Sequence, residues 1–135
     1  ITFECGGMAS RIDFGKRPYT WVLQQGGRAH VIGGSGRQFF FVPKGTKTFA
    51  VAMTTSDGWG QISIRDSVGE VMLAKKGNYS PGQELGVSVP AGSDGSVWSF
   101  QISRCEDAAG IYLLGVPPYA AASPELLLVP RECLE

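Results

Sequence analysis

The length, composition and charge of the chain exclude several classes of protein. It has 135 residues, 43% of them apolar, and its 12 Lys and Arg residues balance its 12 Asp and Glu residues. A chain of this length forms one domain that buries about two thirds of the surface exposed by the unfolded chain. Balanced charge argues against a nucleic-acid binder and against a disordered tail. No apolar run reaches the roughly 20 residues needed to span a bilayer. We therefore expect one soluble domain, residues 1–135, with neither nucleic acid nor a membrane as its partner.

The beginning of the chain has an unusual first residue and an excess of positive charge. It starts at Ile1, with no initiator Met and no basic-then-apolar leader, which predicts an excised fragment or a mature product, one module of a larger protein. Residues 1–50 hold seven Lys or Arg and two acids, net +5, so the remainder is net −5. A solvated surface explains this distribution, and a basic patch along one edge is the alternative.

Short predicted strands follow one another at a spacing of about ten residues, as is typical of all-β domains. In the first part of the chain they cover residues 2–4, 11–14, 20–24 and 29–32, with glycine-rich turns between them. The central strands cover residues 38–42, 48–53, 61–65, 84–89 and 97–102. Within them, large apolar side chains alternate with small or polar ones, so that each strand has one heavy face. The pattern predicts an antiparallel β-sandwich, jelly-roll-like in character.

The C-terminal segment breaks this pattern. After a predicted strand at residues 110–114, Pro117 and Pro118 end the ladder, and the Ser123-Pro124-Glu125 sequence predicts one short helical turn through residues 126–128. Pro130 ends that turn. We expect residues 117–135 to form an apolar tail that docks across the sandwich or faces a neighbouring domain.

The cysteines and acidic residues give little support for a metal site or a disulfide. Cys5, Cys105 and Cys133 match no zinc or redox motif. Free, mostly buried cysteines are expected, and the alternative is a disulfide from Cys133 to Cys5 or to Cys105. No cofactor is expected. Glu106-Asp107 is either a solvated turn or part of a structural calcium site, although the aspartate-rich loop of a dedicated site is absent.

Catalytic motifs are also lacking. His30 is the only histidine, and no Gly-x-Ser-x-Gly motif accompanies it, so a Ser-His-acid triad is not expected. A glycosidase needs only two carboxylates, but Asp57-Gly58 and Asp94-Gly95 are pairs typical of tight turns. The prediction is that the protein is not an enzyme, and an autonomous hydrolase ranks third among the hypotheses.

Three short sequence motifs resemble motifs that recur in β-sandwich accessory domains of bacterial glycoside hydrolases. They are FVPKGTK from Phe41, VPAGSDGSVWSF from Val89 and LGVPPY from Leu114, and the resemblance covers the chain from about Arg37 to Leu128. Such domains are usually non-catalytic carbohydrate-binding or packing modules. The resemblance thus implies a secreted or extracellular bacterial protein whose partners are a polysaccharide or oligosaccharide and a catalytic domain in the same parent chain.

Exposed aromatic side chains are the candidates for contact with a sugar, because a flat ring stacks on the apolar face of a pyranose. Trp98 is in phase with Phe100 and is predicted to lie in the core. Trp59, between two glycines at a predicted loop tip, is the main binding candidate, and Asp57 lies beside it.

Two further aromatic positions are weaker candidates. Trp21 shares a predicted strand face with Tyr19 and Leu23, so these residues form either a core stripe or a two-ring platform. Tyr79 lies in a predicted loop with polar neighbours.

Two functions from different classes remain. The first is a carbohydrate-binding accessory module of a polysaccharide-degrading enzyme, which binds through Trp59 with help from Trp21, Tyr19 or Tyr79 and from a basic edge. The second is a structural sandwich that packs on a catalytic domain without binding sugar itself, and its motivation is the apolar stretch of residues 117–128.

Overall fold

A computed structural model describes most of the chain. Its backbone is described for residues 2–6, 9–13, 17–24, 29–32, 34–56, 58–106 and 108–135, and side chains are described for the same ranges from residue 17 onward, except 29–32. Among these residues, β1 (Thr2–Gly6) and β2 (Ala9–Asp13) form an antiparallel hairpin, and the strands that follow form two larger sheets.

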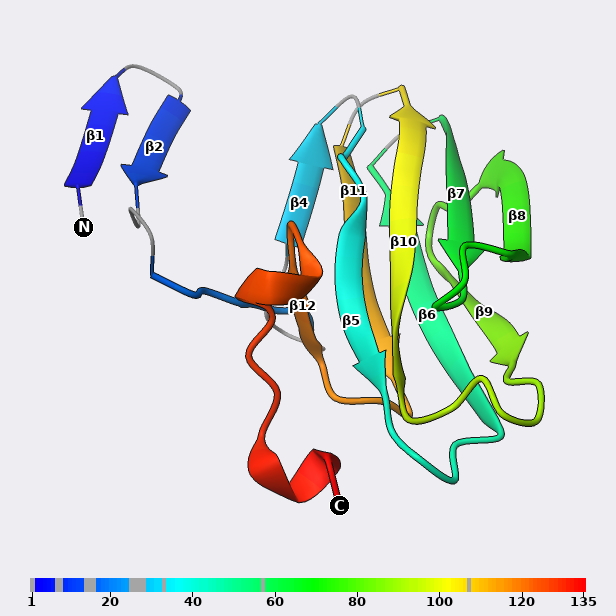
Figure 1. The fold of residues 1–135 in the computed structure, drawn as a ribbon. Coiled ribbons are helices and arrows are strands. Elements are labelled where there is room, and N and C mark those ends of the chain that lie inside the picture. Colours follow the sequence, from blue (N-terminus) through cyan, green and yellow to red (C-terminus); the bar gives the residue numbers. More distant parts are fainter. Residues whose placement is uncertain are drawn as a thin grey trace.

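The two larger sheets are antiparallel throughout and pack as a sandwich (Figure 1). The six-stranded sheet has the order β3-β12-β5-β10-β7-β8, and the four-stranded sheet has the order β4-β11-β6-β9. The strands are β3 (Trp21–Val22), β4 (Ala29–Ile32), β5 (Gln38–Val42), β6 (Thr48–Thr55), β7 (Trp59–Arg65), β8 (Val71–Asn78), β9 (Gln83–Ser88), β10 (Ser96–Cys105), β11 (Ala108–Leu114) and β12 (Tyr119–Ala121).

The chain crosses between the two sheets at nearly every connection. Strands β4, β6, β9 and β11 lie in one sheet, and β5, β7, β8, β10 and β12 lie in the other. The facing quartets β4-β11-β6-β9 and β5-β10-β7-β8 have the strand order of a jelly roll. The predicted all-β, jelly-roll-like sandwich is therefore confirmed.

The core lies between the sheets and is built by the alternation seen in the sequence. Trp98 has no exposed surface, and its ring meets the ring of Phe49 edge to face at 5.5 Å between centroids. Phe40 packs on Phe49 at the same centroid distance. The indole N–H of Trp98 donates to the Ser93 carbonyl at 2.8 Å, so the buried polar atom is satisfied. The predicted core position of Trp98 is confirmed.

Two strands were not predicted. β8 is the edge strand of the six-stranded sheet, and its Ala-Lys-Lys-Gly sequence has no alternation of apolar and polar residues because neither a core nor a neighbour covers much of it. The prediction that Pro117 and Pro118 end the ladder is wrong, because β12 follows them at once and inserts between β3 and β5. A proline lacks only its own N–H, so the chain can pair again one residue later.

The C-terminal tail contains two short 3-10 turns, η1 (Pro124–Leu126) and η2 (Arg131–Cys133). η1 lies close to the predicted helical turn, and η2 follows the proline that was expected to end the structure. Ser123 precedes η1 but makes no side-chain cap; its hydroxyl bonds to Glu125 instead and lowers the pKa of that carboxyl. The Leu128 N–H donates to the Thr20 hydroxyl at 2.9 Å, a contact between the tail and the segment directly before β3.

Candidate functional site

Trp59 is the first residue of β7 and not the tip of a loop. Its side chain is partly exposed, and it points to the outside of the six-stranded sheet because its neighbour Gly60 and then Ile62 point inward. The Lys76 ammonium lies 4.1 Å from the centroid of the Trp59 ring, and the Arg104 guanidinium lies 5.6 Å from it. These cations come from β8 and β10, the two strands that flank β7. The sheet therefore assembles a tryptophan and two cations from three separate parts of the sequence.

The turn before Trp59 is held by an acid from another loop. The Trp59 backbone N–H donates to the Glu106 carboxylate at 3.2 Å, and the Glu106 N–H donates to the Trp59 carbonyl at 3.1 Å. Gly58 has a φ of 67° and packs so close to that carboxylate that a Cβ would overlap it. Glu106 thus fixes the backbone at Trp59, a role different from the predicted calcium ligand.

Trp59 belongs to a larger exposed surface, which we call the open face. It consists of the outward positions of β7, β8 and β10 as the cross-strand pairing defines them, since directly paired residues share a face. These are Trp59, Gln61, Ser63 and Arg65 on β7, Val71, Ala74, Lys76 and Asn78 on β8, and Ser99, Gln101 and Arg104 on β10, of which Ser99 is buried. From Trp59 to Arg65 the open face extends about 20 Å along the strands.

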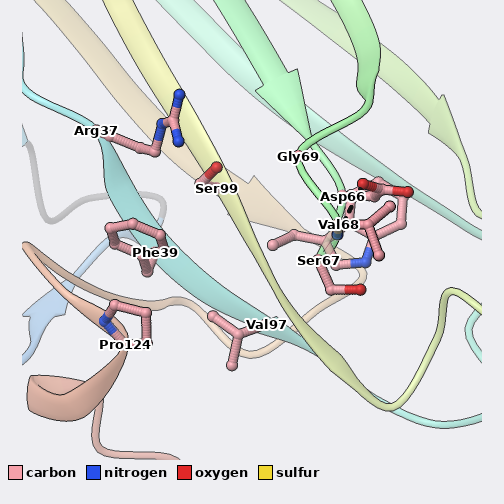
Figure 2. Close-up of a pocket in the computed structure, with 10 residues that line it drawn as sticks. Arg37, Phe39, Asp66, Ser67, Val68, Gly69, Val97, Ser99 and Pro124 are labelled. Carbon is pink, nitrogen blue, oxygen red and sulfur yellow. Dashed lines mark hydrogen bonds between the residues drawn. The ribbon is translucent and has the colours of Figure 1, made fainter.

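One end of the open face deepens into a groove of about 390 Å³. Figure 2 shows Arg37, Phe39 and Pro124 on one side of it and the β7–β8 turn on the other, with Val97 and Ser99 between them. The turn is rigid because the Asp66 carboxylate accepts hydrogen bonds from the N–H groups of Val68 and Glu70, at 3.0 and 2.8 Å. The groove was not predicted, because it combines β5, β10, a turn and the tail.

Tyr19 and Trp21 lie together at the far edge of the same sheet. Their rings are 6.0 Å apart with an angle of 85° between the planes, so they form a corner and not a flat platform. Trp21 is 48% exposed, whereas Leu23 is buried. Strands β12, β5 and β10 separate β3 from β7, which places these two strands roughly 19 Å apart across the sheet. The structure does not bring the two tryptophans into one site.

Tyr79 is not available for stacking. It has no exposed surface, and its hydroxyl donates to the Lys75 carbonyl at 3.1 Å. Burial raises its pKa above the ordinary value of 10.0. The polar neighbours suggested an exposed loop, but the residue comes directly after β8 and turns its ring into the sandwich, where it belongs to the core cluster.

Several other predictions concern residues outside the described part of the chain. Asp57 and Asp107 lie outside it, as do the side chains of Cys5 and His30. Asp94 is described, and its carboxylate accepts a hydrogen bond from the Gly45 N–H at 2.6 Å, which joins two turns and supports the structural interpretation of that residue.

The cysteines that are described do not carry the alternative disulfide. Cys133 is a free thiol in η2, partly exposed, and Cys105 is buried at the end of β10. The pairing of Cys133 with Cys5 or Cys105 is therefore wrong. Within the described ranges no three His, Cys, Asp or Glu side chains gather closely enough to hold a metal ion.

In the described portion, no helix has the length and apolar character required to cross a bilayer. Comparison of the chain with models of protein families, with curated proteins and with solved structures finds no match. The resemblance to accessory domains of glycoside hydrolases consequently stays a prediction from the sequence.

Proposed function

We propose that this domain is a non-catalytic carbohydrate-binding module that holds a polysaccharide on its open face, as the accessory domain of a secreted bacterial polysaccharide-degrading enzyme. The observation that carries the proposal is the position of Trp59. It is a partly exposed aromatic ring at one end of a surface lined by amide and hydroxyl side chains. Such a ring contributes a flat apolar surface for a pyranose, and the polar side chains Gln61, Ser63 and Gln101 offer hydrogen bonds to its hydroxyls.

The shape of the open face fits an extended ligand. The tail partly covers the neighbouring strands β12 and β5 of the same sheet, because Pro124 lines the groove. In Figure 1 no other described segment of the chain lies over β10, β7 and β8. An exposed sheet surface about 20 Å long accommodates several sugar residues side by side. A small soluble metabolite would leave most of this surface uncovered.

Affinity electrophoresis of the whole chain through gels that contain soluble polysaccharides tests the proposal. We expect at least one polysaccharide to retard the wild type, and Trp59→Ala to abolish the retardation. Trp21→Ala is the matched control because it removes an exposed tryptophan at the opposite edge, and it should migrate like the wild type. Retardation by no polysaccharide, or equal retardation of Trp59→Ala, would refute the proposal.

A second candidate is a structural domain that packs on a catalytic domain of the same parent chain. Its support is the tail, where Leu128 is 51% exposed and Leu134 is 60% exposed although both are apolar. This function predicts that Leu128→Ser and Leu134→Ser weaken the association with the neighbouring domain of the full-length protein. If the tail is protected from proteolysis equally well in the wild-type full-length protein and in these two variants of it, the result would argue against this function.

A further inference from the structure

We infer that the ligand of the open face is an anionic polysaccharide, one that carries uronate carboxylates or sulfate esters, and not a neutral one. The inference rests on the proposed function and names the chemistry of its ligand. It comes from the distribution of charge over the two outer surfaces of the sandwich, from the spacing of the cations and from the contacts of Trp59.

The two outer surfaces of the sandwich differ in charge, although the net charge of the chain is zero. The open face holds Arg65, Lys76 and Arg104, and its paired strand positions include neither Asp nor Glu. The carboxylates at its two ends, Glu106 and Asp66, accept hydrogen bonds from backbone N–H groups. The outward positions described on the four-stranded sheet hold Glu84 and neither Lys nor Arg. With 12 charges of each sign in the chain, a surface with three cations and no acid is a local property. It attracts anions along its whole length.

The cations are arranged along the strands in a way that suits a polymer. Lys76 and Arg104 both pair with Gln61 and so form one row across the sheet. Arg65 lies four residues further along β7, about 13 Å away, and Arg37 reaches the groove beside it. A single small anion reaches only one end of this arrangement, either the pair Lys76 and Arg104 or the pair Arg65 and Arg37. A chain with a charge on successive sugar units contacts all of them.

The contacts of Trp59 discriminate against a neutral sugar. The Lys76 ammonium lies over the ring at 4.1 Å, so a sugar that stacks there displaces it. A neutral sugar leaves the ammonium without a partner, whereas a uronate or a sulfated sugar places its apolar face on the ring and its anionic group beside Lys76 and Arg104. Arg65 is held in place because its guanidinium donates to the Gly69 carbonyl at 2.9 Å, and its planar fork has further N–H donors for an anionic group.

A polysaccharide fits the face better than a nucleic acid does. A single-stranded nucleic acid is bound by a series of aromatic rings on which successive bases stack, and Trp59 is the one aromatic residue among the described open-face positions. Short hydroxyl and amide side chains separate the cations instead. Binding of DNA is therefore an outcome for the experiment to exclude.

Polysaccharides that differ only in charge test the inference. One pair is homogalacturonan with high and with low methyl esterification, and the other is a sulfated galactan with and without its sulfate esters, so the two pairs separate carboxylate from sulfate recognition. For the full chain we expect at least one polymer of high charge to bind ten-fold or more tightly than its partner of lower or no charge. Raising the salt from about 50 to 500 mM should reduce that preference, because exposed charges are screened.

Substitutions that each remove one positive charge show which cations bind the anionic polymer. Lys76→Gln and Arg104→Gln should each weaken binding of the anionic polymer several-fold. Lys44→Gln and Lys47→Gln remove the same charge from exposed positions between β5 and β6, away from the open face, and should leave binding unchanged. An unchanged thermal midpoint confirms that each variant is folded.

The outcomes separate this inference from the proposed function. Equal or tighter binding of the neutral polymers would refute the anionic ligand and leave a carbohydrate-binding module. Equal losses in the Lys44→Gln and Lys47→Gln variants, or binding of single-stranded DNA as tight as that of the best polysaccharide, would also refute it. Retardation by no polymer at all would refute both.

Discussion

The strand register determines which residues of the open face lie next to one another. Trp59 was identified from the sequence because two glycines flank it, but the cations beside it are 17 and 45 residues further along the chain. Their approach depends on the pairing of Lys76 and Arg104 with Gln61, and that pairing involves a β-bulge in β10 between Ile102 and Arg104. A β-bulge changes which side chains of a strand face outward. No local sequence pattern predicts the bulge in β10. The tryptophan was therefore predictable, and its two cations were not.

Tyr79 makes a prediction at the same scale. Tyr79→Phe removes the hydrogen bond to the Lys75 carbonyl, and we expect a loss of about 0.5–1.5 kcal/mol in the free energy of unfolding at pH 7.5. Because burial raises the pKa of Tyr79 in the folded state, the unfolded state gives up this proton first as the pH rises above 10. The stabilisation is complete below pH 10 and is lost as the pH passes through the folded-state pKa.

Urea unfolding between pH 7.5 and 11 measures this effect. The difference in stability between the wild type and Tyr79→Phe should narrow above pH 10. Tyr112→Phe, at a partly exposed position of β11, serves as the control and should leave the high-pH decline of the wild type in place. If the difference in stability between the wild type and Tyr79→Phe stays constant or widens above pH 10, the raised pKa of Tyr79 would be contradicted.

At the scale of elements, the strands with one buried face were predictable and the two that depend on their neighbours were not. β5, β6, β9 and β10 alternate large and small side chains because one face meets the core, and their positions were predicted to within a few residues. β8 lies at an edge and lacks this alternation. β12 has three residues, and only the presence of β3 and β5 on either side makes it a strand. Such strands require tertiary contacts that local sequence does not encode.

The insertion of β12 makes a second prediction. Ala120 has no exposed surface and pairs with both Phe40 and Trp21, whereas Ala122, two residues on, is exposed. Ala120→Leu adds volume where none is available, and we expect it to destabilise the domain by about 1–3 kcal/mol. Ala122→Leu adds the same atoms at the surface and should change stability by less than about 0.5 kcal/mol. Urea midpoints compare the two, and equal values would show that β12 is not packed as described.

For the whole molecule, the cysteines report on global unfolding. Cys105 is 6% exposed at the end of β10, and Cys133 is partly exposed in the tail. In the native protein, a thiol reagent should react quickly with Cys133 and reach Cys105 only when the sandwich unfolds. Cys133→Ser should therefore lose a fast-reacting thiol, and Cys105→Ala should keep every fast-reacting thiol of the wild type.

The comparison of these two variants cancels the contribution of Cys5, which both retain. Three reactive thiols in unreduced protein under denaturing conditions would confirm that no disulfide is present. A fast phase that disappears in Cys105→Ala would contradict the burial of that residue.

The position of β12 between β3 and β5 also governs when the domain can fold during synthesis. Within the described ranges, β3 pairs in its sheet only with β12, about one hundred residues later in the sequence, and β4 pairs only with β11. The first strands of the sandwich therefore emerge from the ribosome well before their partners exist. Closing such long loops slows folding. The buried residues of β5, whose partners β10 and β12 also come late, therefore stay exposed until nearly the entire domain has been made. A nascent chain arrested before residue 119 should thus be a target for chaperones, and one arrested with residues 1–135 outside the exit tunnel should not.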